Sequence, residues 1–146
     1  MHRSVSFLLF LVVPLAVSLL GACGASEPPR PVSIPRPEIY AELSDRPFFG
    51  SGSQAAVNVL VTVRNLAAVP ITIRRAEVDA PGMTQYTIRR ATRDFHETVA
   101  PGEEKTVTVF TTAITTVQRP TEPLTLRALV SFEAGGERWR EMVLMH

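Results

Sequence analysis

Two rows of apolar residues that recur at every second position constrain the fold of this chain more than any other feature. The first row consists of Val57, Val59, Val61 and Val63. The second row consists of Leu124, Leu126, Ala128, Val130 and Phe132. Because successive side chains of a β-strand point to opposite faces, each row predicts a long strand with one buried face. Such one-sided strands need a second sheet to cover them.

Shorter alternating stretches extend this pattern through residues 38–146. They predict strands at 39–43, 70–78, 83–90, 107–111 and 138–145, with turn residues at 65–68, 81–82, 101–104 and 134–137. The stretch 91–100 is ambiguous, although Phe95 is expected to pack against the core, as are Trp139 and Val143. About seven short strands over roughly a hundred residues predict an all-β fold, a single Ig-like antiparallel β-sandwich.

One predicted strand changes its apolar phase part-way along. Ile71 and Ile73 occupy odd positions, whereas Ala76 and Val78 occupy even ones. One extra residue near Arg74-Arg75, forming a β-bulge, would produce this shift.

Residues 1–22 have the organisation of a secretory signal peptide. Arg3 precedes an apolar run from residue 5 to residue 20 that is interrupted by Pro14. This run is short for a helix that spans a bilayer, which needs about 20 apolar residues. It ends in Leu20-Gly21-Ala22-Cys23, which resembles the lipobox of bacterial lipoproteins.

The lipobox resemblance implies a defined lipid chemistry. Leu20, Gly21 and Ala22 would be recognised by the lipoprotein signal peptidase, and the Cys23 thiol would carry diacylglycerol, with a further acyl chain on the freed amine. Several acyl chains anchor a protein firmly. The resemblance therefore implies a protein of the cell envelope, bound to a membrane through the lipid on Cys23. An ordinary signal peptide or an uncleaved anchor, with Cys23 present by chance, is the alternative.

The residue after the cysteine bears on which membrane would be used. In lipoproteins of enteric bacteria an Asp at this position favours retention in the inner membrane, and this chain has Gly24 there. The resemblance therefore implies the outer membrane, facing the periplasm, where the organism has one.

Residues 23–37 are predicted to be a linker that carries the lipidated cysteine. Five prolines lie between residues 28 and 37, and proline favours an extended, solvated chain. At about 3.1 Å per residue, such a spacer would hold a domain up to roughly 40 Å from the lipid surface. The alternative is a docking segment for a proline-binding domain.

Charge and cysteine content exclude two classes of protein. Removal of residues 1–22 would take away Arg3 and no acidic residue, which leaves 14 basic and 14 acidic residues. Nucleic-acid binding needs a basic surplus, so no nucleic-acid partner is expected. The single cysteine, Cys23, excludes a framework of intramolecular disulfides.

Residues 57–109 resemble the bacterial members of the LEA type 2 family, also called the WHy domain. The resemblance rests on the segment 59–65 (VLVTVRN), the segment 69–73 (VPITI) and Pro101-Gly102-Glu103. The family pattern has proline where this chain has Leu66, and its early aromatic residue could correspond to Tyr40. The resemblance implies a small Ig-like sandwich, often exported, with a role in protection against desiccation and stress.

Residues that could carry chemistry are few. Neither His96 nor His146 is accompanied by the Gly-x-Ser-x-Gly motif of a serine hydrolase, so we expect no enzyme, catalytic residue, metal or cofactor. A periplasmic copper carrier is the alternative, because Cu(I) binds Met and His. Its ligands would come from His96, Met83, Met142, Met145 and His146. A regular strand would place Met142 and Met145 on opposite faces.

The function expected from the sequence is a non-enzymatic binding or structural module with an envelope protein as its partner. Ig-like sandwiches usually act through strand edges and loops. The adjacent Phe48 and Phe49 would form a binding loop or close one end of the sandwich.

Arginines gather at positions 74–75, 89–93 and 138–140 and could contact anionic lipid headgroups. Nearby acids favour balanced surface charge instead. These acids are Glu77, Asp79, Asp94, Glu137 and Glu141.

Overall fold

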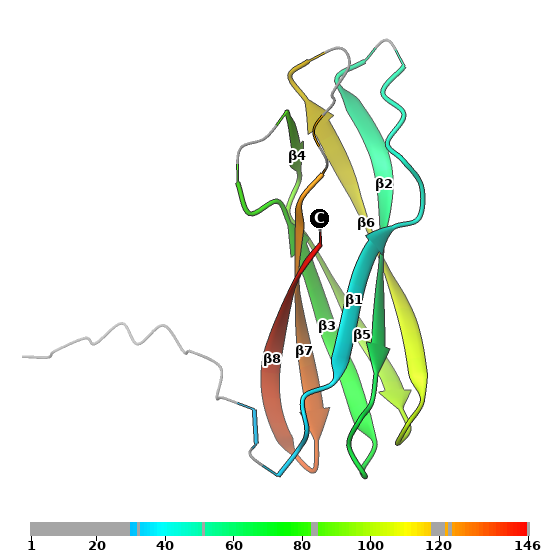
Figure 1. Ribbon diagram of the computed structural model, residues 1–146, viewed down its shortest axis with the longest axis vertical. Helices are drawn as coiled ribbons and strands as arrows, with labels where there is room; N and C mark the ends of the chain where they lie inside the picture. Colours follow the sequence, from blue (N-terminus) through cyan, green and yellow to red (C-terminus); the bar gives the residue numbers. More distant parts are fainter. Residues whose placement is uncertain are drawn as a thin grey trace, which may run out of the picture.

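The computed structural model describes residues 30–31, 33–50, 52–82, 85–117, 122 and 124–145. This part of the chain is all β, with eight strands in two antiparallel four-stranded sheets that face each other (Figure 1). The strands are β1 (Glu38–Leu43), β2 (Gln54–Arg64), β3 (Ile71–Asp79), β4 (Tyr86–Ile88), β5 (Ala91–Val99), β6 (Glu104–Thr115), β7 (Leu126–Ala134) and β8 (Glu137–Met145). Within these residues no helix is long and apolar enough to cross a membrane.

The order of the strands matches the predicted Ig-like sandwich. One sheet has the order β1-β2-β6-β4 and the other has β5-β3-β7-β8. These orders contain the A-B-E and C-F-G arrangements of immunoglobulin domains, with β4 in the D position beside β6 and β5 in the C′ position beside β3. The chain passes from one sheet to the other between β4 and β5, at Arg89 and Arg90.

Both apolar rows that dominate the sequence form the core. Val59, Val61 and Val63 of β2 and Val130 and Phe132 of β7 are all fully buried in one hydrophobic core. The predicted inward position of Trp139 is confirmed, since its ring is fully buried and stacks on Phe132 with the ring centroids 5.5 Å apart. The buried residues of these strands therefore occupy every second position, as the sequence pattern predicts.

The number of strands was the least accurate part of the prediction. The ambiguous stretch forms β5, which raises the number from about seven to eight, and Phe95 packs half-buried against the core as expected. The predicted strand 83–90 is shorter, because only residues 86–88 pair with β6 before the chain changes sheets. Ile88 points inward there, whereas Met83 lies outside the described residues.

The last residues of the predicted linker pack against the sandwich. Ile34 joins the hydrophobic core, and Pro37 is also buried. Arg30 and Arg36 both bind Glu141 of β8, at 3.1 and 3.0 Å. The expectation of a fully solvated spacer up to Pro37 therefore does not hold for these residues, because their apolar side chains find a partner at the sandwich edge.

The motifs that carry the LEA type 2 resemblance meet at one end of the sandwich. The buried Asn65 side chain donates hydrogen bonds to the carbonyls of Val69 and Val99, at 2.8 and 3.0 Å, and accepts one from the Ala67 amide. Its backbone also exchanges hydrogen bonds with residues 102 and 103 of the next turn. These contacts give the motif residues a structural role, while stress protection stays a prediction.

Candidate functional site

A β-bulge in β3 places two consecutive arginines on the solvent-facing side of the β5-β3-β7-β8 sheet. Ile73 pairs with Phe132, and the next pair is Arg75 with Ser131, so Arg74 is an extra residue opposite β7. In a regular strand one of two neighbouring side chains would point into the core. The bulge expected from the phase shift is therefore confirmed, and it turns both Arg74 and Arg75 outward.

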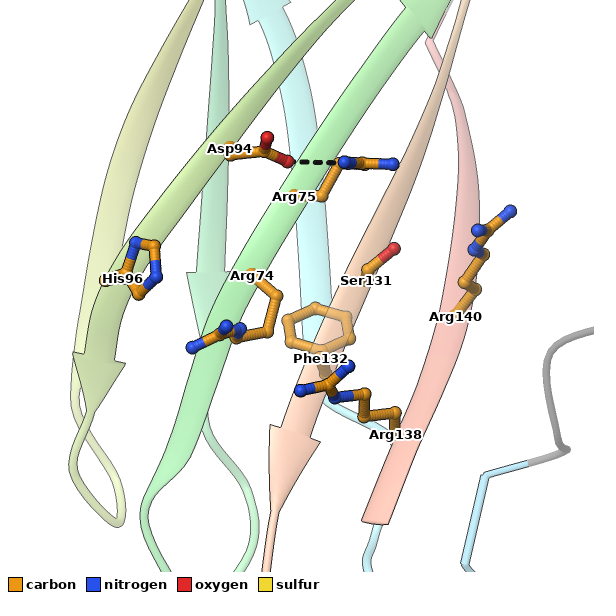
Figure 2. Close-up of a pocket in the computed structure, with 8 residues that line it drawn as sticks. All are labelled: Arg74, Arg75, Asp94, His96, Ser131, Phe132, Arg138 and Arg140. Carbon is orange, nitrogen blue, oxygen red and sulfur yellow. Dashed lines mark hydrogen bonds and ion pairs between the residues drawn. The ribbon is translucent and has the colours of Figure 1, made fainter. Parts of the chain in front are cut away.

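The register of the four strands builds a hollow around these arginines (Figure 2). Asp94 of β5, Arg75, Ser131 and Arg140 of β8 are cross-strand neighbours in a row across the sheet. Ser131 is short and buried, so it forms a low floor between longer side chains. The hollow measures about 400 Å³. Its lining residues are Arg74, Arg75, Asp94, His96, Ser131, Phe132, Arg138 and Arg140.

Positive charge exceeds negative charge around the hollow. The Glu133 carboxylate is shared by Arg138 at 3.0 Å and Arg74 at 3.6 Å. Asp94 accepts a 2.6 Å hydrogen bond from Arg75 Nε, which lowers the pKa of the Asp94 carboxyl and raises the pKa of the Arg75 guanidinium. The three guanidinium groups of Arg74, Arg75 and Arg138 thus share these two carboxylates.

A second arginine cluster lies further along the same sheet face and is balanced. Asp79 receives two hydrogen bonds from Arg127, at 2.8 and 2.5 Å, and one from Arg90 at 3.3 Å. Arg90 also binds Glu77 at 3.0 Å. The hydrogen bonds from Arg127 lower the pKa of the Asp79 carboxyl despite its partial burial. Two arginines here face two carboxylates.

The acids that are close to the arginines in the chain lie at different places in the structure. Glu77 and Asp79 belong to the balanced cluster. Glu141 is out of phase with Arg138 and Arg140 along β8 and binds the N-terminal segment instead. The expectation of balanced charge is therefore confirmed at Asp79. Ser131, which forms the floor, was not singled out because nothing in its local sequence marks it.

The remaining predicted binding residues are separate from one another. The lipobox Leu20-Gly21-Ala22-Cys23 lies outside the described residues, as do Met83 and His146. His96 lines the hollow, and the exposed Met142 lies on β8, which is three strand spacings or roughly 14 Å across the sheet. Met145 is half-buried against the core. Among the described residues no three His, Cys, Asp or Glu side chains form a group that could hold a metal ion.

Phe49 and Arg93, from two other segments, pack against neighbouring side chains. Phe48 is exposed, whereas Phe49 is half-buried against the core, so the two phenylalanines do not form one surface. Arg93 lies over the rings of Phe95 and Phe110, with its guanidinium carbon 5.3 and 5.4 Å from their centroids. It also donates a hydrogen bond to the Thr108 carbonyl.

Comparison with known proteins supports the fold alone. No protein-family model matches the chain, and no curated protein sequence matches it. A Northeast Structural Genomics Consortium target, SoR45, is similar over 75% of this chain and 82% of its own, with 15% identity and a TM-score of 0.50. A protein from Archaeoglobus fulgidus is 16% identical, with 75% of this chain and 93% of its own covered, and has a TM-score of 0.45. A FixG-related protein from Vibrio parahaemolyticus is 8% identical, with 77% and 96% covered, and has a TM-score of 0.37.

Proposed function

We propose that this chain is a lipid-anchored protein of the cell envelope whose β-sandwich is a non-enzymatic binding module. The observation that carries the anchor is Leu20-Gly21-Ala22-Cys23 directly after the apolar run, with Cys23 as the single cysteine of the chain. Cleavage before Cys23 and acylation of its thiol and amine would attach the domain to a membrane.

The surface of the sandwich supports a binding role. The hollow presents arginine side chains, which stay charged at all physiological pH values and donate hydrogen bonds without exchanging protons. Such groups suit recognition of an anionic partner better than acid–base chemistry. The partner would be a component of the envelope.

The path of the chain suggests how the module would be presented. Residues 30–37 join the sandwich beside the β7–β8 hairpin, at the end that also carries the turns at 65–70 and 100–103 (Figure 1). Arg30 is seven positions after Cys23 in the chain, a distance that an extended chain spans with at most roughly 25 Å. Anchoring at Cys23 would therefore hold this end of the sandwich near the lipid, closer than a solvated spacer up to residue 37 would.

Intact mass measurement of the protein extracted from membranes tests the anchor. The full chain, Cys23→Ser and the control Gly24→Ser would be expressed in a bacterium with the lipoprotein pathway. We expect a species that begins at residue 23 and carries acyl mass for the full chain and for Gly24→Ser, and none for Cys23→Ser. A chain cut elsewhere, or left uncut with Cys23 unmodified, would contradict the proposal.

A further inference from the structure

One end of the sandwich exposes apolar side chains with almost no charge among them. Strand pairing brings the turns 65–70, 100–103 and 135–136 together at this end (Figure 1). In these three turns, all of which the structure describes, Glu103 is the only charged residue. The exposed apolar residues of the turns are Leu66, Ala68, Val69, Pro70 and Pro101.

The turn 65–70 holds two large apolar side chains in solvent on a fixed backbone. Leu66 is 46% exposed and Val69 is 47% exposed. Between them Ala67 is buried, and the Asn65 side chain binds the Val69 carbonyl and the Ala67 amide. Because the turn is braced from inside, a partner that covers Leu66 and Val69 would have little conformational freedom to remove.

The N-terminal segment indicates which partner faces this turn. Arg30 binds Glu141 at 3.1 Å, and Glu141 lies four positions along β8 from Glu137, where the strand begins. Four strand positions span roughly 13 Å. The proposed lipid attachment at Cys23 is at most roughly 25 Å from Arg30. A lipid on Cys23 can therefore lie level with the turn 65–70.

We infer that the turn 65–70 contacts the bilayer that holds Cys23, with Leu66 and Val69 inserted at the boundary between headgroups and acyl chains. The inference rests on the proposed anchor and adds a second contact, made by the protein itself. A short tether gives an effective concentration on the order of millimolar, so a small apolar surface suffices. The polar backbone of the turn keeps the contact at the boundary, because the hydrocarbon core cannot satisfy it.

Fluorescence quenching on the lipidated full chain tests the inference. The Cys23 thiol is bound to lipid, so Ala68→Cys supplies a free thiol that can carry the fluorophore NBD. Phe48→Cys is the control, because Phe48 is 87% exposed in the loop between β1 and β2, at the opposite end. In phosphatidylcholine vesicles, aqueous iodide should quench the label at residue 68 about threefold less than at residue 48. Equal quenching would overturn the inference.

Paired substitutions assign the contact to the two apolar side chains. Leu66→Gln with Val69→Thr should raise iodide quenching at residue 68 to the level at residue 48. Leu144→Gln with Val117→Thr makes the same changes at exposed residues outside this end and should leave the quenching unchanged. Unfolding midpoints would establish that both variants are folded. Protection that survives the first pair, or that both pairs abolish, would overturn the inference.

Two further readouts separate the bilayer from a protein partner and from failure of the anchor. Protection of residue 68 in cell membranes, with none in pure lipid vesicles, would assign the turn to an envelope protein and overturn the inference. A chain that carries acyl mass but leaves residue 68 in water would overturn the inference while the anchor stands. Absence of acyl mass would contradict the anchor and, with it, the inferred contact.

Discussion

The two arginine clusters on the outer face of the β5-β3-β7-β8 sheet differ in the burial of the aspartate that binds their arginines. Around Asp79, two arginines face two carboxylates, and Asp79 itself is largely buried. Around the hollow, Arg74, Arg75 and Arg138 share Asp94 and Glu133, and the Asp94 side chain is exposed. At one place, arginines therefore join β3, β7 and the segment that enters β5 through a buried carboxylate. At the other place, arginines of the same sheet form more exposed ion pairs.

The largest effect on stability is expected at the balanced cluster. Asp79→Asn removes a charged acceptor shared by Arg127 and Arg90, and it should lower the free energy of unfolding by about 1.5–3 kcal/mol. Chemical denaturation measures this loss. Asp94→Asn makes the same chemical change in an exposed pair beside the hollow and should cost less. Equal losses would remove the distinction between the two clusters.

The contribution of Asp79 should also depend on pH. Its pKa in the folded protein lies below the ordinary value, since Arg127 stabilises the carboxylate. The stabilisation is therefore fully present above the unfolded pKa of about 3.9 and is lost as the pH falls through the lower folded pKa. Denaturation between pH 7 and pH 2 should show that the free energies of unfolding of wild type and Asp79→Asn approach each other below about pH 4. A constant gap across this range would argue for a packing effect.

The smallest effect on stability is expected from an arginine of the hollow. Arg138→Gln removes one exposed positive charge, and Glu133 keeps Arg74 as a partner, so the free energy of unfolding should change by no more than about 0.5 kcal/mol. Arg127→Gln at the balanced cluster should destabilise the protein more, because Asp79 then loses both hydrogen bonds from that side chain. The reverse order would mean that the hollow arginines serve mainly to stabilise the fold.

Much of the fold could be predicted because its determinants are local. The valine row of β2 and the phase change around Arg74 are properties of neighbouring residues, and they predicted a buried strand face and the bulge. The strand β5 was ambiguous because it is an edge strand rich in charged residues, in which Phe95 and Val99 are the large apolar residues that pack on the core. Its backbone pairing with β3 makes this segment a strand, although its own sequence pattern does not predict one.

The hollow was only partly predictable. The arginines form clear groups in the sequence, but five acids close to them in the chain predict that their charges are balanced. Strand alternation sends Glu141 away from Arg140, although the two are adjacent in the chain. Ser131 becomes the floor of a site only through its neighbours on β3 and β8.

The sequence by itself determined which faces of the strands are buried and where the bulge lies, because each depends on a short run of residues. Only the tertiary structure decided which charges meet. Arg75 and Arg140 are 65 positions apart in the chain and become cross-strand neighbours of Ser131 through the register of three strands. Opposing charges interact through space over a few ångströms, so the net charge of a surface depends on strand register and not on proximity in the chain.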